Sequence, residues 1–435
     1  MNLMNCTRMM KRIFTFTGIA SLVFGCVGNL QSENPYPEAT AEVSKVYPTS
    51  DTFDWTIYDP DPEHLWNRVF RQFYVRVATD GKEYGMGELD PLLWFDTTHL
   101  LNGISYQQAV QVLDEFLAAN AERLVLDPLK RAMFQRDMWA VFDWLVFQSE
   151  PYPSQREELE TRLAQVIKRL ALTREQILSL PNNYQLAVES KSFPTDYKAD
   201  NPTAAFLPSD LFEENSAWIP MGRAGGPIAM SHTNEFPFFA RSVFLVFVRN
   251  PEGRKATFDF IQSLNREPKS VLTAGSDVAL VRRMLLVDDQ GELVLSPLIE
   301  TIQIRHFNPE QIFHEFEVDR RRLINGDADT FNLKTQLFML FFSHGDVFER
   351  DHGPELQATI PDICKACHFN SPPLPNYGNS QSVISVSRSN FPLPNNERPI
   401  LIPTSWENEA QLVIEWKQNH NTWQALETYW IRKNP

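Results

Sequence analysis

The sequence predicts an α+β protein with a helical N-terminal half, a mixed sheet with helices in the middle, and a loop-rich C-terminal region that ends in a helix. Two patterns lead to this prediction. Apolar residues recur at helical spacing in the first half, and apolar runs separated by turn residues follow from about Phe206. With 435 residues, 43% of them hydrophobic, the chain exceeds what one core usually organises, so we expect more than one packed unit.

Helix start signals place four helices in the first half. Three are pairs of a capping Ser or Thr with a Gln or Glu three residues later, and one is an Asp followed by a first-turn Pro. They are Ser105 with Gln108, Ser154 with Glu157, Thr173 with Gln176, and Asp127-Pro128. The run from Met133 to Phe147 is apolar nearly all round, which predicts a buried helix.

Strand signals dominate the middle of the chain. Ser242 to Val248 is a continuous apolar run suited to a central strand, and Ala256 to Leu264 is expected to form a short helix. Val278 to Val287 and Leu293 to Ile304 flank four turn residues, which predicts a β-hairpin. Phe313 to Val318 alternates like a further strand.

The C-terminal region is expected to combine irregular chain with one final helix. A segment rich in Pro and Asn, Ser371 to Pro403, precedes a helix capped by Thr404, with Glu407 three residues later. This helix is expected to dock on the body of the protein through a large aromatic face, formed by Leu412, Trp416, Trp423, Leu426 and Trp430. We predict five parts: a signal peptide at 1–25, a tether at 26–52, a helical region at 53–200, an α+β sheet region at 201–335, and the C-terminal region at 336–435.

The first 26 residues have the features of an export signal. Basic residues from Arg8 to Arg12 precede the apolar core Ile13 to Phe24, which is too short for a transmembrane helix. The run Val23-Phe24-Gly25-Cys26 resembles a bacterial lipobox, in which the cysteine is acylated. The resemblance implies a periplasmic or outer-membrane lipoprotein of a bacterium, attached to the membrane only through the lipid on Cys26. The alternative is secretion without a lipid.

The exported chain is strongly acidic. Loss of the signal removes three of the 40 basic residues and none of the 55 acidic ones, which takes the formal net charge from −15 to −18. Phosphate binding needs clustered Lys and Arg, so this charge argues against nucleic acid as a partner. A basic redox partner protein suits the charge, although acidity also keeps an exported protein soluble.

Two of the 4 cysteines lie in one five-residue motif, Cys364-Lys365-Ala366-Cys367-His368. Two thiols at this spacing can each form a thioether with a haem vinyl group while the adjacent imidazole binds the iron. In this motif the sequence resembles c-type cytochromes. The resemblance implies one covalent haem c, with Cys364 and Cys367 as attachment residues and His368 as the proximal iron ligand. Residues 336–435 would then be the haem c attachment region.

The sixth iron ligand stays open. No methionine follows the motif, whereas the common small cytochrome fold has one well downstream. His344, at the end of an apolar run, and His352, in a polar loop, are candidate distal ligands. Two further candidates are His420, which is expected to be a surface histidine, and Met339, which is expected in the core.

Two alternatives compete with haem. A disulfide between Cys364 and Cys367 would explain the spacing and the export signal but not His368. A zinc site needs four ligands and would have to recruit His344 or His352. Other signatures are weak: GxSxG and HExxH are missing from the sequence, and Asn325 to Asp329 is acidic but predicted to be a turn rather than a calcium loop.

Three functions therefore stay open from the sequence. The first is electron transfer through a single haem, and the second is a haem enzyme or small-ligand sensor with an open distal iron position. The third is a non-haem surface lipoprotein with a Cys364–Cys367 disulfide.

Overall fold

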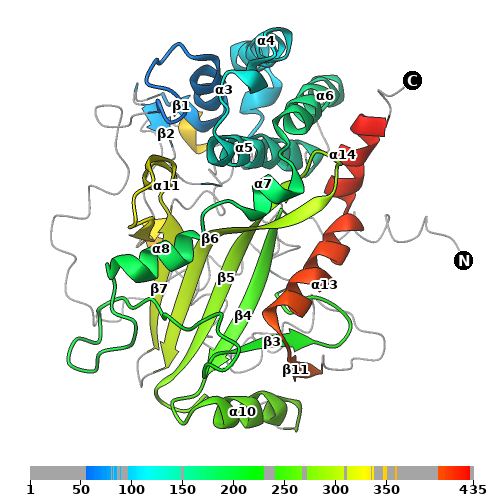
Figure 1. The fold of residues 1–435 in the computed structure, drawn as a ribbon. Helices are drawn as coiled ribbons and strands as arrows, with labels where there is room; N and C mark the ends of the chain where they lie inside the picture. The colour runs from blue at the N-terminus through cyan, green and yellow to red at the C-terminus, as the bar shows by residue number, and fades with distance from the viewer. Residues whose placement is uncertain are drawn as a thin grey trace, which may run out of the picture.

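The computed structural model has an α+β fold, which confirms the predicted class. It describes residues 55–79, 81, 83–85, 89, 97–147, 151–229, 241–266, 272–307, 311–334, 336–337, 346–349, 358–359 and 400–431. A helical layer stands at one end of a seven-stranded antiparallel sheet, and further helices lie along the sheet (Figure 1).

Four long helices form the helical layer, with α5 nearest to the sheet (Figure 1). They are α3 (Leu65–Tyr74), α4 (Gly103–Ala118), α5 (Pro128–Phe147) and α6 (Pro153–Leu170). Beside them lie a small ladder of β1 (Val75–Val77) with β2 (Glu83–Gly85), and the 3-10 turns η2 (His99–Leu101) and η3 (Ala121–Arg123). Every residue from Ala132 to Leu145 in α5 is buried, which agrees with the predicted buried run, but Phe147 at the end of that run is 37% exposed.

The four predicted helices exist, but only two of the predicted starts are right. Asp127 caps α5 by accepting a hydrogen bond from the Lys130 backbone N–H at 2.9 Å, and Thr173 forms a complete capping box at the start of α7 (Arg174–Leu178). Ser105 and Ser154 are not N-caps, because α4 begins at Gly103 and α6 at Pro153. A proline in the first turn is preorganised for a helix, so α6 begins there rather than after the serine.

The sheet contains seven strands in the order β11-β3-β4-β5-β6-β7-β8. Their bounds are β3 (Ile219–Arg223), β4 (Ser242–Arg249), β5 (Ser276–Val287), β6 (Leu293–Phe307), β7 (Gln311–Val318), β8 (Phe331–Lys334) and β11 (Leu401–Pro403). The predicted β5–β6 hairpin is confirmed, and its turn ends at Gly291, whose φ of 85° suits glycine. The predicted short helix is α10 (Arg254–Arg266), which packs near β3 and β11.

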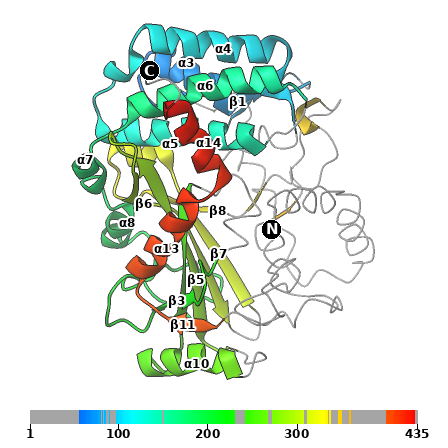
Figure 2. The ribbon, with the colours of Figure 1, turned by 90° about the vertical axis from the view of Figure 1, so that its right-hand side faces the viewer.

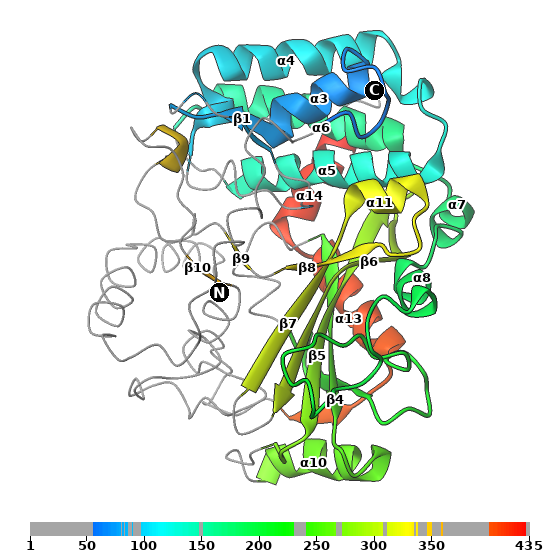
Figure 3. The same ribbon diagram turned by 90° about the vertical axis from the view of Figure 1, so that its left-hand side faces the viewer.

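One face of the sheet, which we name the core face, carries apolar side chains that meet helices. Figures 1 and 2 show α8 (Asn183–Ser190) and α13 (Trp406–Gln418) on the same side of the strands. The connecting chain between α8 and β3 packs on this face as well, with the ring of Phe212 against Phe247 at 5.3 Å and that of Phe193 against Phe316 at 4.8 Å. Figure 3 shows β7 and α11 (Arg320–Asn325) from the other side.

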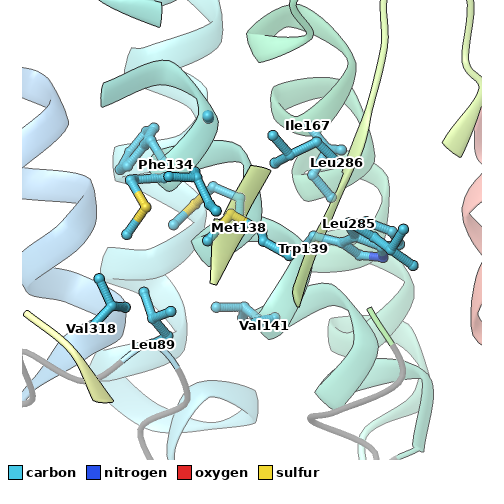
Figure 4. Packing of buried hydrophobic residues seen from close by; sticks show 14 of the residues in the cluster. Leu89, Phe134, Met138, Trp139, Val141, Ile167, Leu285, Leu286 and Val318 are labelled. Carbon is cyan, nitrogen blue, oxygen red and sulfur yellow. The ribbon is translucent and has the colours of Figure 1, made fainter. Parts of the chain in front are cut away.

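The helical layer and the sheet contribute to one hydrophobic cluster. Figure 4 shows Met138 and Trp139 of α5 near Leu285 and Leu286 of β5, with Ile167 of α6 beside them. All five side chains are almost completely buried. The apolar surface of α5 therefore links the two layers.

The predicted C-terminal helix is two helices, α13 and α14 (Asn421–Ile431). Ser405, rather than Thr404, caps α13 by accepting from the Asn408 backbone N–H at 3.2 Å. The chain turns at 419–420, and α14 then docks on α6 and α5, burying Trp423 and Leu426. Leu412 remains 39% exposed, so only part of the predicted aromatic face docks.

Candidate functional site

The residues predicted to bind haem and lipid lie outside the described residues. They are Cys364, Cys367 and His368 of the motif, the candidate distal ligands His344 and His352, and Cys26. Met339 lies outside the described residues as well.

Two short described strands precede the motif. β9 (Gln336–Leu337) follows β8 with one residue between them, and it pairs with β10 (Ala358–Thr359). After the motif the chain returns to the sheet at β11. The motif is thus connected at both ends to positions that the structure defines.

The chain between β9 and β10 contacts the helical layer at η6 (Val347–Glu349). Thr79 donates its backbone N–H to the Phe348 carbonyl at 3.1 Å. Arg76 forms an ion pair with Asp346, and its guanidinium lies 4.7 Å from the centre of the Phe348 ring. The described residues 346–349 are therefore fixed to the helical layer.

Charged side chains are buried where α5 meets the sheet. Glu300 of β6 accepts from Arg136 of α5 at 2.7 Å and from Ser242 at 2.6 Å, and lies 2.5 Å from Arg282 of β5. Although burial alone would raise the pKa of Glu300, the two arginines outweigh it and hold that pKa below its usual value. The result is an ionic link between the helical layer and two central strands.

A second buried group connects α5 with α11 and the first described residues. Asp137 accepts from the Tyr58 hydroxyl at 2.7 Å and from Arg320 at 2.8 Å, and all three side chains are almost fully buried. The Arg320 guanidinium also lies 5.0 Å from the centre of the Phe70 ring. Burial raises the pKa of Asp137, and Arg320 opposes this shift.

A third buried group joins α5 to α13. The Asp143 carboxylate lies 3.6 Å from Lys417 Nζ and 3.7 Å from Arg241 Nη1, distances longer than a hydrogen bond. Lys417 donates instead to Thr422 Oγ1 at 2.7 Å. Because burial outweighs the attraction of the nearby cation Lys417, the pKa of Asp143 rises to about 6. This carboxylate therefore titrates close to neutral pH.

One described histidine is paired with a carboxylate on the core face. His306 Nδ1 lies 2.6 Å from Asp277 Oδ1, and the Tyr197 ring stacks on the imidazole at 3.7 Å. Arg249 binds the other oxygen of Asp277 at 2.6 Å. The pair is thus held by Arg249 at the carboxylate and by Tyr197 at the imidazole.

Three other histidines have shielded imidazoles: that of His314 is buried, and those of His99 and His420 are half-buried. Burial lowers the pKa of His99, His314 and His420 to about 4, so all three are neutral at pH 7. His420 was expected at the surface, but its ring packs against Phe147 and Trp416, and its Nδ1 lies 2.9 Å from Thr422 Oγ1.

Within the described ranges, no group of three His, Cys, Asp or Glu residues is placed to hold a metal ion.

Asn325 to Asp329 forms the predicted turn, with Gly326 in the left-handed conformation that ends α11. A depression of about 340 Å³ lies at the start of α5, between Pro128 and the α7 residues Glu175 and Gln176, and it is wide open to solvent.

The buried charges of α5 are the feature that the sequence analysis missed. Arg136, Asp137 and Asp143 lie inside the run that was predicted only as a buried apolar helix. The available signal was the presence of three charged residues in that run, since charges are buried only when they are paired.

No family model, no curated protein and no solved structure matches this chain. Among the described helices, none has both the length and the apolar character needed to cross a bilayer.

Proposed function

We propose that this chain is an exported monohaem c-type protein that transfers electrons through one covalently bound haem. Cys364 and Cys367 would attach the haem, and His368 would be the proximal iron ligand. The observation that carries the proposal is the CxxCH motif, which holds the only thiols of the chain apart from Cys6 in the signal and Cys26 in the lipobox.

The chemistry of the donor set fits haem c. Two thiols separated by two residues match the two vinyl groups of one haem, and the imidazole of the next residue matches the iron. When bound, the haem supplies one iron that cycles between two oxidation states, and axial ligation and burial set its potential. Among the chain's own residues, His368 would bind the iron, and His344 or His352 would be the candidate distal ligand.

The fold supports this assignment by limiting where the motif can lie. Four residues separate Thr359 at the end of β10 from Cys364, and a chain of this length spans at most about 18 Å. Since β9 pairs with β10 and follows β8 closely, this length is measured from a point near the β8 edge of the sheet. A haem at this position would lie beside the folded body rather than on a distant tail.

Export and partner choice belong to the same proposal. Thioether attachment of haem occurs outside the cytoplasm, which agrees with a signal at 1–25 and a lipid on Cys26. The protein would be a periplasmic or outer-membrane lipoprotein of a bacterium. Its negative net charge would suit a basic redox partner protein.

A haem stain after denaturing electrophoresis tests the attachment. The full chain and a Cys364→Ala/Cys367→Ala variant are produced in a host with a cytochrome c maturation system, together with a Cys26→Ser control that keeps both motif thiols. We expect the wild type and Cys26→Ser to stain and the double variant to lose the stain. An unstained wild-type band would refute covalent haem.

Absorption spectroscopy and lipid labelling test the rest of the proposal. A six-coordinate low-spin spectrum supports electron transfer, whereas a high-spin spectrum would favour an enzyme or sensor with an open iron position. Labelled palmitate should be incorporated by the wild type but not by Cys26→Ser. Equal labelling of both proteins would contradict lipidation at Cys26.

A further inference from the structure

Three exposed leucines lie beside the start of α5. Leu126, two residues before the helix, is 79% exposed and is the most exposed large apolar side chain among the described residues. Leu124 in the same connection is 55% exposed, and so is Leu178 of α7. We name these three side chains the leucine surface. One exposed leucine needs no explanation, but three at the same place form a candidate contact surface.

An open depression joins the two elements that carry these leucines. Pro128 of α5 lines it on one side, and Leu180 and Pro181, which follow α7, line it on the other. Leu126 and Leu178 are each adjacent in sequence to a residue of this lining. Figures 2 and 3 show the α4–α5 connection and α7 on the same side of the molecule. The leucine surface is therefore one place on the fold.

Basic side chains accompany the leucines. Arg123 directly precedes Leu124, and its side chain is 81% exposed, with the Glu122 carboxylate 3.7 Å away. Arg174 is exposed as well and lies four residues before Leu178, so the two share one side of α7. Leucines that can enter an apolar layer, with cations beside them, are features of a surface that lies on lipid headgroups.

Carboxylates are present near the same place. Asp127 accepts from the Lys130 backbone N–H at 2.9 Å as the cap of α5, and Glu175 accepts from the Thr173 hydroxyl at 3.2 Å. The loop at 59–63 carries three more. Their charges oppose an attraction to anionic headgroups. Binding to a bilayer at this place would therefore depend first on the leucines and second on the cations.

The chain enters the fold beside the leucine surface. Its first described residue is Trp55, and the Tyr58 carbonyl accepts from Lys130 Nζ, in the first turn of α5, at 2.7 Å. If Cys26 carries a lipid, 29 residue steps join that lipid to Trp55, and covalent geometry limits their span to about 100 Å. The bilayer would then stay within reach of the folded body, so even a weak contact would be populated.

We propose that the leucine surface docks on the lipid bilayer that anchors the chain. The leucines enter the boundary between headgroups and acyl chains, and Arg123 and Arg174 meet headgroup phosphates. This inference rests on the proposed lipid at Cys26 but not on the proposed haem. It assigns to the folded body a second, direct contact with the membrane.

Fluorescence quenching by lipids tests the contact. An environment-sensitive fluorescent amino acid replaces Leu126 in the full chain, or Ile104 as the matched control. Ile104 is 72% exposed at the other end of α4, a helix of 16 residues and about 24 Å. Each protein is reconstituted in vesicles of phosphatidylethanolamine and phosphatidylglycerol that contain a lipid with a quencher on its acyl chain. We expect quenching at position 126 and none at position 104.

A second fluorophore position measures the contribution of one leucine. With the fluorophore in place of Leu178, Leu126→Ser should lower the equilibrium constant for docking about tenfold, because one apolar side chain no longer leaves water. Ile104→Ser should leave the quenching at position 178 unchanged. Equal effects of the two substitutions would contradict docking through the leucine surface.

The outcomes separate this inference from the proposed function. Absence of quenching at 126, or equal quenching at 104, would overturn docking even if the protein incorporates palmitate and shows a Soret band. Quenching at 126 alone would support docking with or without a Soret band. If palmitate is not incorporated, vesicles are added in excess, and absence of quenching at 126 again overturns docking. A fluorescence change at 126 that depends on protein concentration without vesicles would identify a second copy of the chain as the occupant and overturn docking on lipid.

Discussion

Replacing Glu300 with Gln should destabilise the protein strongly. The substitution keeps the shape of the side chain and its contact with Ser242, but it removes the charge that faces Arg136 at 2.7 Å and Arg282 at 2.5 Å. Glu300 and Arg136 are 0% exposed. Loss of one partner of such a pair leaves uncompensated buried charge and costs about 3–5 kcal/mol. That is a large share of the about 5–15 kcal/mol that stabilises a typical domain.

Urea denaturation at pH 7, followed by far-ultraviolet circular dichroism, measures this loss through the midpoint and the slope. The matched control is Asp114→Asn, which breaks the 2.7 Å ion pair with Arg162, because the Asp114 side chain is 54% exposed. An exposed pair contributes only about 0.2–1 kcal/mol. The structure therefore predicts a clear gap between two substitutions that remove the same charge.

The pH dependence of the Glu300 effect has a definite sign. Burial would raise the pKa of Glu300, but Arg136 and Arg282 hold that pKa below its usual value. The charged carboxylate therefore stabilises the fold fully at pH values above the usual pKa. This stabilisation is lost as the pH falls through the lower pKa of the folded state. The difference between wild type and Glu300→Gln should persist from pH 7 to pH 5. A loss no larger than that of Asp114→Asn would refute the reasoning, since the carboxylate would then be hydrated in solution.

Two further substitutions test other parts of the structure. Because burial raises the pKa of Asp143 to about 6 from 3.8, its contribution is fully present below the unfolded value and is lost as the pH rises through about 6. The free energy of unfolding of the wild type, relative to that of Asp143→Asn, should therefore increase by roughly 1.4 kcal/mol per pH unit as the pH falls from 6 towards 4. Urea denaturation at pH 7 and at pH 5 measures this difference. An unchanged difference would contradict a buried carboxylate. Thr173→Ala should lower the free energy of unfolding by about 1 kcal/mol, because it removes the capping box of α7, whereas Thr173→Ser should keep most of that stabilisation. Equal losses for the two variants in thermal unfolding would count against the cap.

The parts of the fold that were predicted correctly depend on local patterns. The buried helix α5, the strand β4 and the β5–β6 hairpin follow from apolar periodicity and turn residues within one stretch of chain. Helix starts were less predictable, since Ser105 and Ser154 have capping side chains but lie inside helices that begin one or two residues earlier. One continuous C-terminal helix was predicted, whereas the chain turns between α13 and α14.

The sequence by itself determined which chemistry is predicted. Haem attachment at the CxxCH motif and lipidation at Cys26 are predictions that depend on the covalent spacing of a few adjacent residues, so they need no fold. Tertiary structure decided which charges share the interior, because Glu300 meets Arg136 and Arg282 only after α5 has packed on the sheet. It also decided that Lys334 and Pro403 lie at opposite edges of the sheet. That separation follows from pairing between strands far apart in sequence, a property that no local pattern contains.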